Sequence, residues 1–212
     1  MKMGKSLLSL GIIVLLIGIA FLISNNLSSK TDDATVVINI QPLDGIKDVS
    51  NVTEDFVKFY LNPLELQNYE IRVLPHKNTP DSTFNSARTR YRANKIVNFL
   101  HYNTQPGEFT IGVTDKDIST SIHGSNDYGI LGLSFLGHKK RACITSTYRL
   151  KYKKDLWKLI AHEFTHGYFS QNHCKVDDDA CIMQDAKGKS PRFENKCYLC
   201  PQCIYEIEQK RK

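Results

Sequence analysis

The sequence has few cysteines, no internal repeat and no strong excess of one charge. Six cysteines in 212 residues are too few for a small scaffold held together by disulfides, so metal binding or free thiols are the better interpretation. A repeat with a period of about 20–50 residues is absent, which excludes a repeat architecture. The formal charge of +6 favours acidic partners only weakly.

The rest of the composition is that of an ordinary folded protein. Hydrophobic residues make up 41% and charged residues 24% of the chain, which excludes a disordered, collagen-like or low-complexity protein. The length suits one domain with a real core. We therefore predict one folded domain over residues 31–212, preceded by a separate segment at residues 1–30.

That first segment contains a long apolar run. Residues 7–23 (LLSLGIIVLLIGIAFLI) carry no charge and would span about 25 Å as a helix, the short end of a bilayer core. No small-x-small cleavage site follows, which favours an uncleaved membrane anchor, with a cleaved secretory signal as the alternative. Lysines before the run and Asp32-Asp33 after it predict an extracytoplasmic domain.

Apolar patterning predicts strands alternating with helices, which indicates an α/β fold. The predicted strands are 34–42, 69–74, 109–114, 130–136 and 142–148. The predicted helices are 51–63, 82–103 and 155–169. Residues after 169 have a loop-like composition, and the basic end at 210–212 is expected to be a disordered tail.

The last predicted helix contains a metal-binding pattern, His162-Glu163-Phe164-Thr165-His166. Histidines at i and i+4 project from one helical face, so both can bind a single Zn²⁺. Glu163 lies beside that face, where it can take a proton from a zinc-activated water. The mid-helix position is the context that this HExxH motif requires.

A catalytic zinc needs a third protein ligand. His173 is the nearest candidate, because Gly167 can end the helix and let the chain turn back. A distant glutamate, Glu194 or Glu206, is the alternative.

Cysteines cluster directly after His173. They are Cys174, Cys181, Cys197, Cys200 and Cys203. The Cys200-Pro-Gln-Cys203 knuckle has the spacing of a four-cysteine zinc site. Disulfides are the alternative for an exported chain.

The stretch HEFTHGYFSQNHCKVDDDACIMQ…CPQC resembles the archaemetzincins, which are metzincin-clan zinc peptidases. The combined histidine and cysteine pattern is highly specific, and the resemblance extends over about residues 35–205. It implies a compact metzincin-like domain, with a mixed twisted sheet packed by helices and a cysteine-rich C-terminal segment. It also implies a peptide or protein substrate. We expect no nucleic-acid partner and a monomer.

The resemblance assigns a role to each motif residue. His162, His166 and His173 would bind a catalytic zinc, with Glu163 as the general base. Met183 would form the Met-turn beneath the site, and the strand at 130–136 would be the sheet edge that receives the substrate. A second, structural zinc would be held by Cys174, Cys181, Cys200 and Cys203.

Two departures from the family pattern leave alternatives open. The turn before His173 is one residue longer than in the family, and Phe169 stands where the family has glycine. Either His173 has shifted into place, or the chain is a zinc-stabilised binding protein without turnover. Cys197 is an extra cysteine that could replace Cys200, although the CPQC pair matches the family knuckle. A zinc-ribbon nucleic-acid binder is a third hypothesis, which the anchor argues against.

Overall fold

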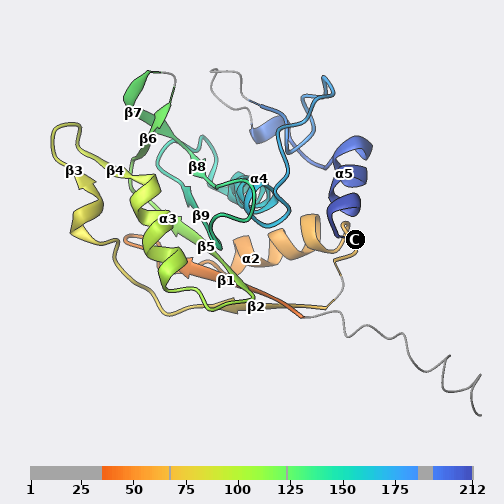
Figure 1. Ribbon diagram of the computed structural model, residues 1–212, viewed down its shortest axis with the longest axis horizontal. Coiled ribbons are helices and arrows are strands. Elements are labelled where there is room, and N and C mark those ends of the chain that lie inside the picture. Colours follow the sequence, from red (N-terminus) through yellow and green to blue (C-terminus); the bar gives the residue numbers. More distant parts are fainter. Residues whose placement is uncertain (1–34, 67, 123, 186–192, 212) are drawn as a thin grey trace, which may run out of the picture. The chain divides into compact units, whose positions relative to one another are not determined.

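Two β-sheets organise the chain, as the computed structural model shows for residues 35–66, 68–122, 124–185 and 193–211 (Figure 1). The main sheet has five strands in the order β2-β1-β5-β9-β8. Their bounds are β1 Val36–Pro42, β2 Tyr69–Val73, β5 Glu108–Thr114, β8 Gly132–Leu133 and β9 Ala142–Ser146. The first four strands in this order run parallel, and β8 is antiparallel to β9 at the sheet edge.

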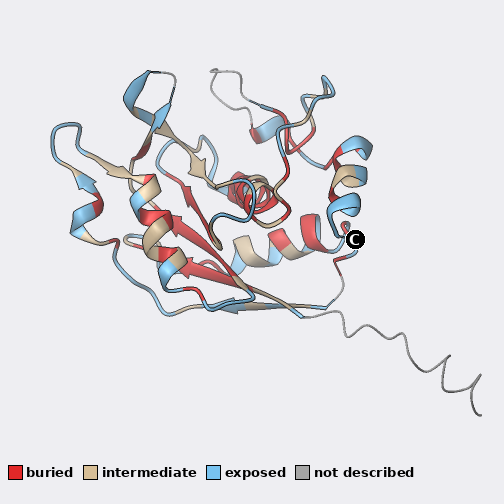
Figure 2. Cartoon of the chain, viewed as in Figure 1, coloured by how far each residue is buried: buried red, intermediate tan, exposed pale blue. Residues whose placement is uncertain are grey.

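Helices cover both faces of this sheet. On one face lies α3 (Ala93–Tyr102). On the other lie α4 (Leu156–Tyr168), preceded by a 3₁₀ turn at Lys153–Asp155, and α2 (Ser50–Phe56), which continues as π-helix over Val57–Leu61. The two faces of the sheet belong to different hydrophobic clusters. In strand β9, Ile144 packs with the cluster around α3, and Cys143 packs with the cluster around α4. The central strands are therefore buried on both sides (Figure 2), as parallel sheets usually are.

The predicted α/β class and mixed sheet are confirmed. The predicted strands 34–42, 69–74 and 109–114 coincide with β1, β2 and β5. The strand predicted at 142–148 is β9, which ends at Ser146. Strands β1, β5 and β9 are runs rich in β-branched and apolar residues, which are typical of buried strands. Strand β2 alternates apolar and charged residues, the pattern of a strand with one exposed face.

The predicted helix over 82–103 is wrong in its first half. A 3₁₀ turn (Asp81–Thr83) and the strands β3 (Phe84–Asn85) and β4 (Arg90–Arg92) precede α3. Thr89 adopts a φ of 54°, a left-handed conformation that interrupts a helix.

A second sheet, which the sequence did not predict, has the order β3-β4-β6-β7. It includes the hairpin of β6 (Ile118–Ile122) and β7 (Ser125–Ile130). The strand predicted over 130–136 is therefore wrong in its bounds, because Ile130 ends β7 and β8 covers only Gly132–Leu133.

The end of the chain is more ordered than predicted. A 3₁₀ turn at Phe193–Asn195 is followed by α5 (Pro201–Arg211), which begins with the proline that favours a first helical position. The Lys210 ammonium donates to Ser170 O over 2.8 Å, and the Arg211 guanidinium donates to Leu64 O over 3.2 Å. The expectation of a disordered basic tail is therefore wrong at Lys210 and Arg211.

The predicted membrane anchor lies outside the described residues and stays a prediction. Within the part of the chain that the structure describes, no helix is both long and apolar enough to cross a bilayer. Thr35–Lys212 forms one compact unit by its internal contacts.

Candidate metal centre

Helix α4 places His162 and His166 side by side. The core side of the helix carries Ile160 and Phe164, both fully buried, so the histidines emerge on the opposite side, one turn apart. Their Nε2 atoms lie 3.1 Å from each other. Helix α4 therefore brings both imidazoles to one point, as the i, i+4 spacing predicts.

Backbone carbonyls set the tautomer of both histidines. His162 Nδ1 lies 2.8 Å from Ile182 O, and His166 Nδ1 lies 2.5 Å from Gln171 O. A carbonyl only accepts hydrogen bonds, so each Nδ1 carries the proton and donates. Each Nε2 then keeps its lone pair for a metal, which is the usual arrangement around a metal-binding histidine.

His173 joins the other two histidines. The ligand atoms of His162, His166 and His173 all lie within 4.8 Å of one another. The backbone N–H of Cys174 donates to Met183 O over 2.8 Å, which ties the residue next to His173 to the turn at Met183, the predicted Met-turn.

The two glutamates considered as alternative ligands have other partners. Glu194 pairs with Lys151 over 3.1 Å, and the Glu206 carboxylate accepts hydrogen bonds from Gln171 and Gln202. The group of clustered ligand atoms around His162 and His166 contains His173 and neither glutamate.

The longer turn before His173 is built around Ser170. Helix α4 ends at Tyr168, and Ser170 adopts a φ of 52°. Helices commonly end with a residue in this left-handed conformation, usually a glycine. Gln171 N–H then donates to Thr165 O over 3.3 Å. The turn thus closes as a helix C-terminus does, with a serine at the position where glycine is usual.

Burial lowers the pKa of all three histidines. The pKa of His166 falls to about 4, and those of His162 and His173 also lie below the usual value, with burial as the largest cause in each case. A buried imidazole is therefore neutral near pH 7, the form that binds metal ions.

Four cysteines form a second cluster. The Sγ atoms of Cys174, Cys181, Cys200 and Cys203 lie within 4.8 Å of one another. The hydrogen bond between Cys181 and Cys203 lowers the pKa of Cys181 to about 5, whereas burial raises the pKa of Cys174 to about 11. Cys197 is exposed and stands outside this group, so Cys200 is the cysteine that the fold brings to the cluster.

The Glu163 side chain lies at the edge of the main sheet. Its side chain lies against Gly132 of β8, where an added Cβ would come within 2.5 Å of Glu163 Oε1. Burial raises the pKa of Glu163 to about 8. The glutamate of the HExxH motif therefore lies next to the predicted substrate edge.

Lys196 braces the Met-turn, a role that the sequence did not suggest. The ammonium group is almost fully buried and donates to Cys181 O over 3.0 Å and to Gln184 O over 2.9 Å. Ile182, whose carbonyl orients His162, lies between these two residues. Lys196 therefore holds the turn that orients a candidate ligand.

The donor atoms of both clusters suit zinc. Three imidazole nitrogens with one open position are typical of catalytic zinc, and four thiolates are typical of structural zinc. Both sets are already gathered, with two of the imidazoles hydrogen-bonded at the far nitrogen. The residues present therefore fit two zinc ions.

Known proteins show the same fold and a related sequence, although no family model matches the chain. The archaemetzincin of Halobacterium salinarum is 25% identical over 154 residues, which cover 64% of this chain and 83% of that protein. The crystal structure of archaemetzincin from Methanopyrus kandleri superposes with a TM-score of 0.66 at 18% identity, covering 85% of this chain and 98% of the other. The chain is related to the archaemetzincins.

A further solved structure that matches the fold of this chain is the crystal structure of a zinc-dependent peptidase from Methanocorpusculum labreanum. It matches with a TM-score of 0.59 and 21% identity, over 80% of this chain and 99% of the other. The resemblance to archaemetzincins predicted from the histidine and cysteine motifs is thereby confirmed.

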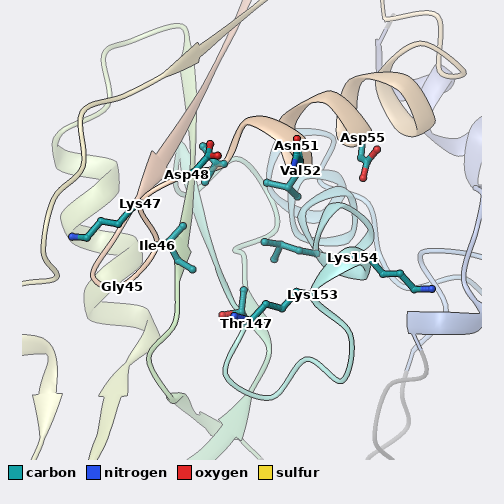
Figure 3. Close-up of a pocket in the computed structure, with 12 residues that line it drawn as sticks. Gly45, Ile46, Lys47, Asp48, Asn51, Val52, Asp55, Thr147, Lys153 and Lys154 are labelled. Atoms are coloured by element: carbon teal, nitrogen blue, oxygen red, sulfur yellow. The ribbon is translucent and has the colours of Figure 1, made fainter.

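This protein has a cavity of about 540 Å³ away from the histidine and cysteine clusters, between the start of α2 and the start of α4 (Figure 3). Lys47, Lys154 and Asp55 line it, and the side chains of Lys47 and Lys154 point in opposite directions (Figure 3). Its charged groups do not converge on one point, and none of the candidate metal ligands lines it.

Proposed function

We propose that this protein is a zinc metallopeptidase in which Glu163 is the general base. The single observation that carries the proposal is the grouping of His162, His166 and His173 within 4.8 Å, with Glu163 on the same helix. The relation to archaemetzincins and to a zinc-dependent peptidase supports the same reaction class.

His162, His166 and His173 would hold the catalytic zinc. A zinc ion in such a site acts as a Lewis acid on a carbonyl oxygen and lowers the pKa of a bound water toward ~7. Cys174, Cys181, Cys200 and Cys203 would hold a second zinc with no open position, which stabilises the fold.

Strand β8 is the proposed substrate edge. It is the last strand of the main sheet, and an edge strand offers backbone hydrogen bonds to an extended peptide whatever its side chains are. Glu163 lies directly against Gly132 of this strand. A peptide paired with β8 would therefore have its backbone near the glutamate.

Glu163 would move the proton during hydrolysis. The carboxylate takes a proton from the attacking water and passes it to the nitrogen of the leaving amine. Burial raises the pKa of Glu163 to about 8, and a general base works best when its pKa is near the working pH. Burial therefore makes the Glu163 carboxylate a stronger base than that of an exposed glutamate.

The Glu163→Gln variant tests this role. It keeps the size of the side chain and removes the base, so peptide cleavage should fall by about 10²-fold or more while zinc content stays unchanged. Cleavage of an unstructured peptide mixture is followed by mass spectrometry, with Glu208→Gln at an exposed position as the control. Full-rate cleavage by Glu163→Gln would refute the mechanism. A wild-type chain that binds zinc and cleaves nothing would favour the non-catalytic binding protein.

A further inference from the structure

Gln171 links the metal-site histidines to the C-terminal helix. Its side chain is completely buried, although it lies in the turn that follows α4. Its backbone carbonyl accepts the hydrogen bond from His166 Nδ1 over 2.5 Å. The position of Gln171 therefore decides how the His166 ring is oriented.

Two residues of α5 hold the Gln171 side chain from both ends. The Gln171 Nε2 group donates to Glu206 Oε2, and the Lys210 ammonium donates to Gln171 Oε1 over 2.8 Å. Lys210 also donates to Ser170 O over 2.8 Å. Glu206 is steadied by Gln202 Nε2, which donates to its other oxygen over 2.8 Å. All the polar groups of the Gln171 side chain are thus bound by one helix.

This turn needs outside support. It is one residue longer than the family pattern, and Ser170 adopts a left-handed φ of 52° that is unfavourable for a residue with a side chain. A turn of this kind has several ways to relax, each of which would move the Gln171 carbonyl. The contacts with α5 bind the two residues, Ser170 and Gln171, on which the conformation depends.

We propose that α5 is a clamp that positions His166 for metal binding, with Lys210 and Glu206 as its positioning residues. The clamp acts through Gln171 and compensates for the longer turn before His173. The inference rests on the proposed zinc site at the three histidines, and it does not require that the site be catalytically active.

Helix α5 is attached to the core by residues other than the positioning residues Lys210 and Glu206. Cys203 and Ile207 are buried in the main core, and Cys203 belongs to the cysteine cluster. These residues fasten the helix whether or not Lys210 is present. Removing the Lys210 ammonium should therefore release the turn without detaching α5.

The test compares Lys210→Met with Gln209→Met in the full chain. Both variants place the same side chain on adjacent exposed positions of α5, but only the first removes the Lys210 contacts with Ser170 and Gln171. Metal binding is titrated with Co²⁺, because imidazole-bound and thiolate-bound cobalt absorb light differently and the two sites can be followed separately. Loss of a group that orients a metal ligand weakens metal binding by about 10–100-fold.

We expect Lys210→Met to weaken cobalt binding at the histidines about 10-fold, with the cysteine site unchanged. Gln209→Met should match the wild type, and Lys210→Arg, which keeps a donor, should recover most of the affinity. Unchanged affinity at the histidines in Lys210→Met, or equal weakening at both sites, would overturn the proposal. Because the readout needs no turnover, failure of the clamp and failure of the peptidase proposal give different results.

Discussion

Glu163 and Gly132 meet between α4 and the edge strand, and their contact leaves no room for a side chain at position 132. An added Cβ at Gly132 would lie 2.5 Å from Glu163 Oε1 and 2.6 Å from Glu163 Cγ, far inside van der Waals contact. The glycine therefore permits the glutamate to lie against the strand that we propose as the substrate edge.

Gly132→Ala should displace the Glu163 carboxyl and reduce peptide cleavage by about 10-fold or more, since a misplaced catalytic group loses rate steeply. Zinc content should not change, because the metal ligands are not touched. Steady-state cleavage rates and zinc analysis measure both effects. Leu133→Met, a volume-conserving change in the same strand, is the control, and equal rates in the two variants would contradict the predicted contact.

His166 predicts a pH dependence for the metal-free protein. Its pKa is about 4 in the folded chain, so the unfolded chain binds the proton first as the pH falls below about 6.5. Stability is then lost between about pH 6.5 and 4, by an amount on the order of 3 kcal/mol for this group. Glu163, with its pKa raised to about 8, gains stability over part of the same range and partly masks the loss.

Comparison with metal-free His166→Asn isolates the histidine contribution, since the Glu163 contribution is common to both proteins. Urea unfolding at several pH values gives the two curves. The wild type should lose more stability than the variant as the pH falls from about 6.5 to 4. Parallel curves would show that His166 is not buried in its neutral form.

Residues that act together within one helix are the ones that the sequence predicts. His162, His166 and Glu163 follow from the i, i+4 spacing alone. Folding brings three further residues to the site, namely Gln171, Gly132 and Lys196. Nothing in the local sequence around them predicts this. His173 was predicted only in part from the sequence. Its position depends on a turn that contains a left-handed serine, and no spacing rule specifies such a turn.

At the scale of elements, prediction succeeded where burial and pattern agree. Strands β1 and β5 are mostly buried apolar runs, and β2 alternates apolar and charged residues; all three were predicted correctly. The helix predicted over 82–103 is wrong in its first half, because the pairing of β4 with β6 outweighs the local helical pattern there, and its second half forms α3. Helix α5 was missed because most of its surface is polar and only Cys203 and Ile207 are buried.

Lys196 gives an element-level prediction for the Met-turn. Lys196→Met would remove a buried ammonium and leave Cys181 O and Gln184 O without this donor, at a cost of about 2 kcal/mol or more in the free energy of unfolding. Urea unfolding of the zinc-loaded protein measures the loss, with exposed Lys153→Met as the matched control. Equal stability of the two variants would show that the brace contributes nothing.

For the whole molecule, the fold brings two metal-binding groups together through neighbouring residues. His173 belongs to the histidine group and Cys174 to the cysteine group, so one short segment serves both. The Met-turn residues contact this segment through Cys174 N–H and Met183 O. The cysteine-rich end of the chain is therefore joined directly to the candidate histidine site.

The number of zinc ions per chain in the purified protein, for the wild type and for His173→Ala, tests the histidine site most directly. We predict two zinc ions in the wild type and one in the variant, because the histidine at the end of the longer turn completes the histidine site. An unchanged count in His173→Ala, whether one or two, would contradict that claim.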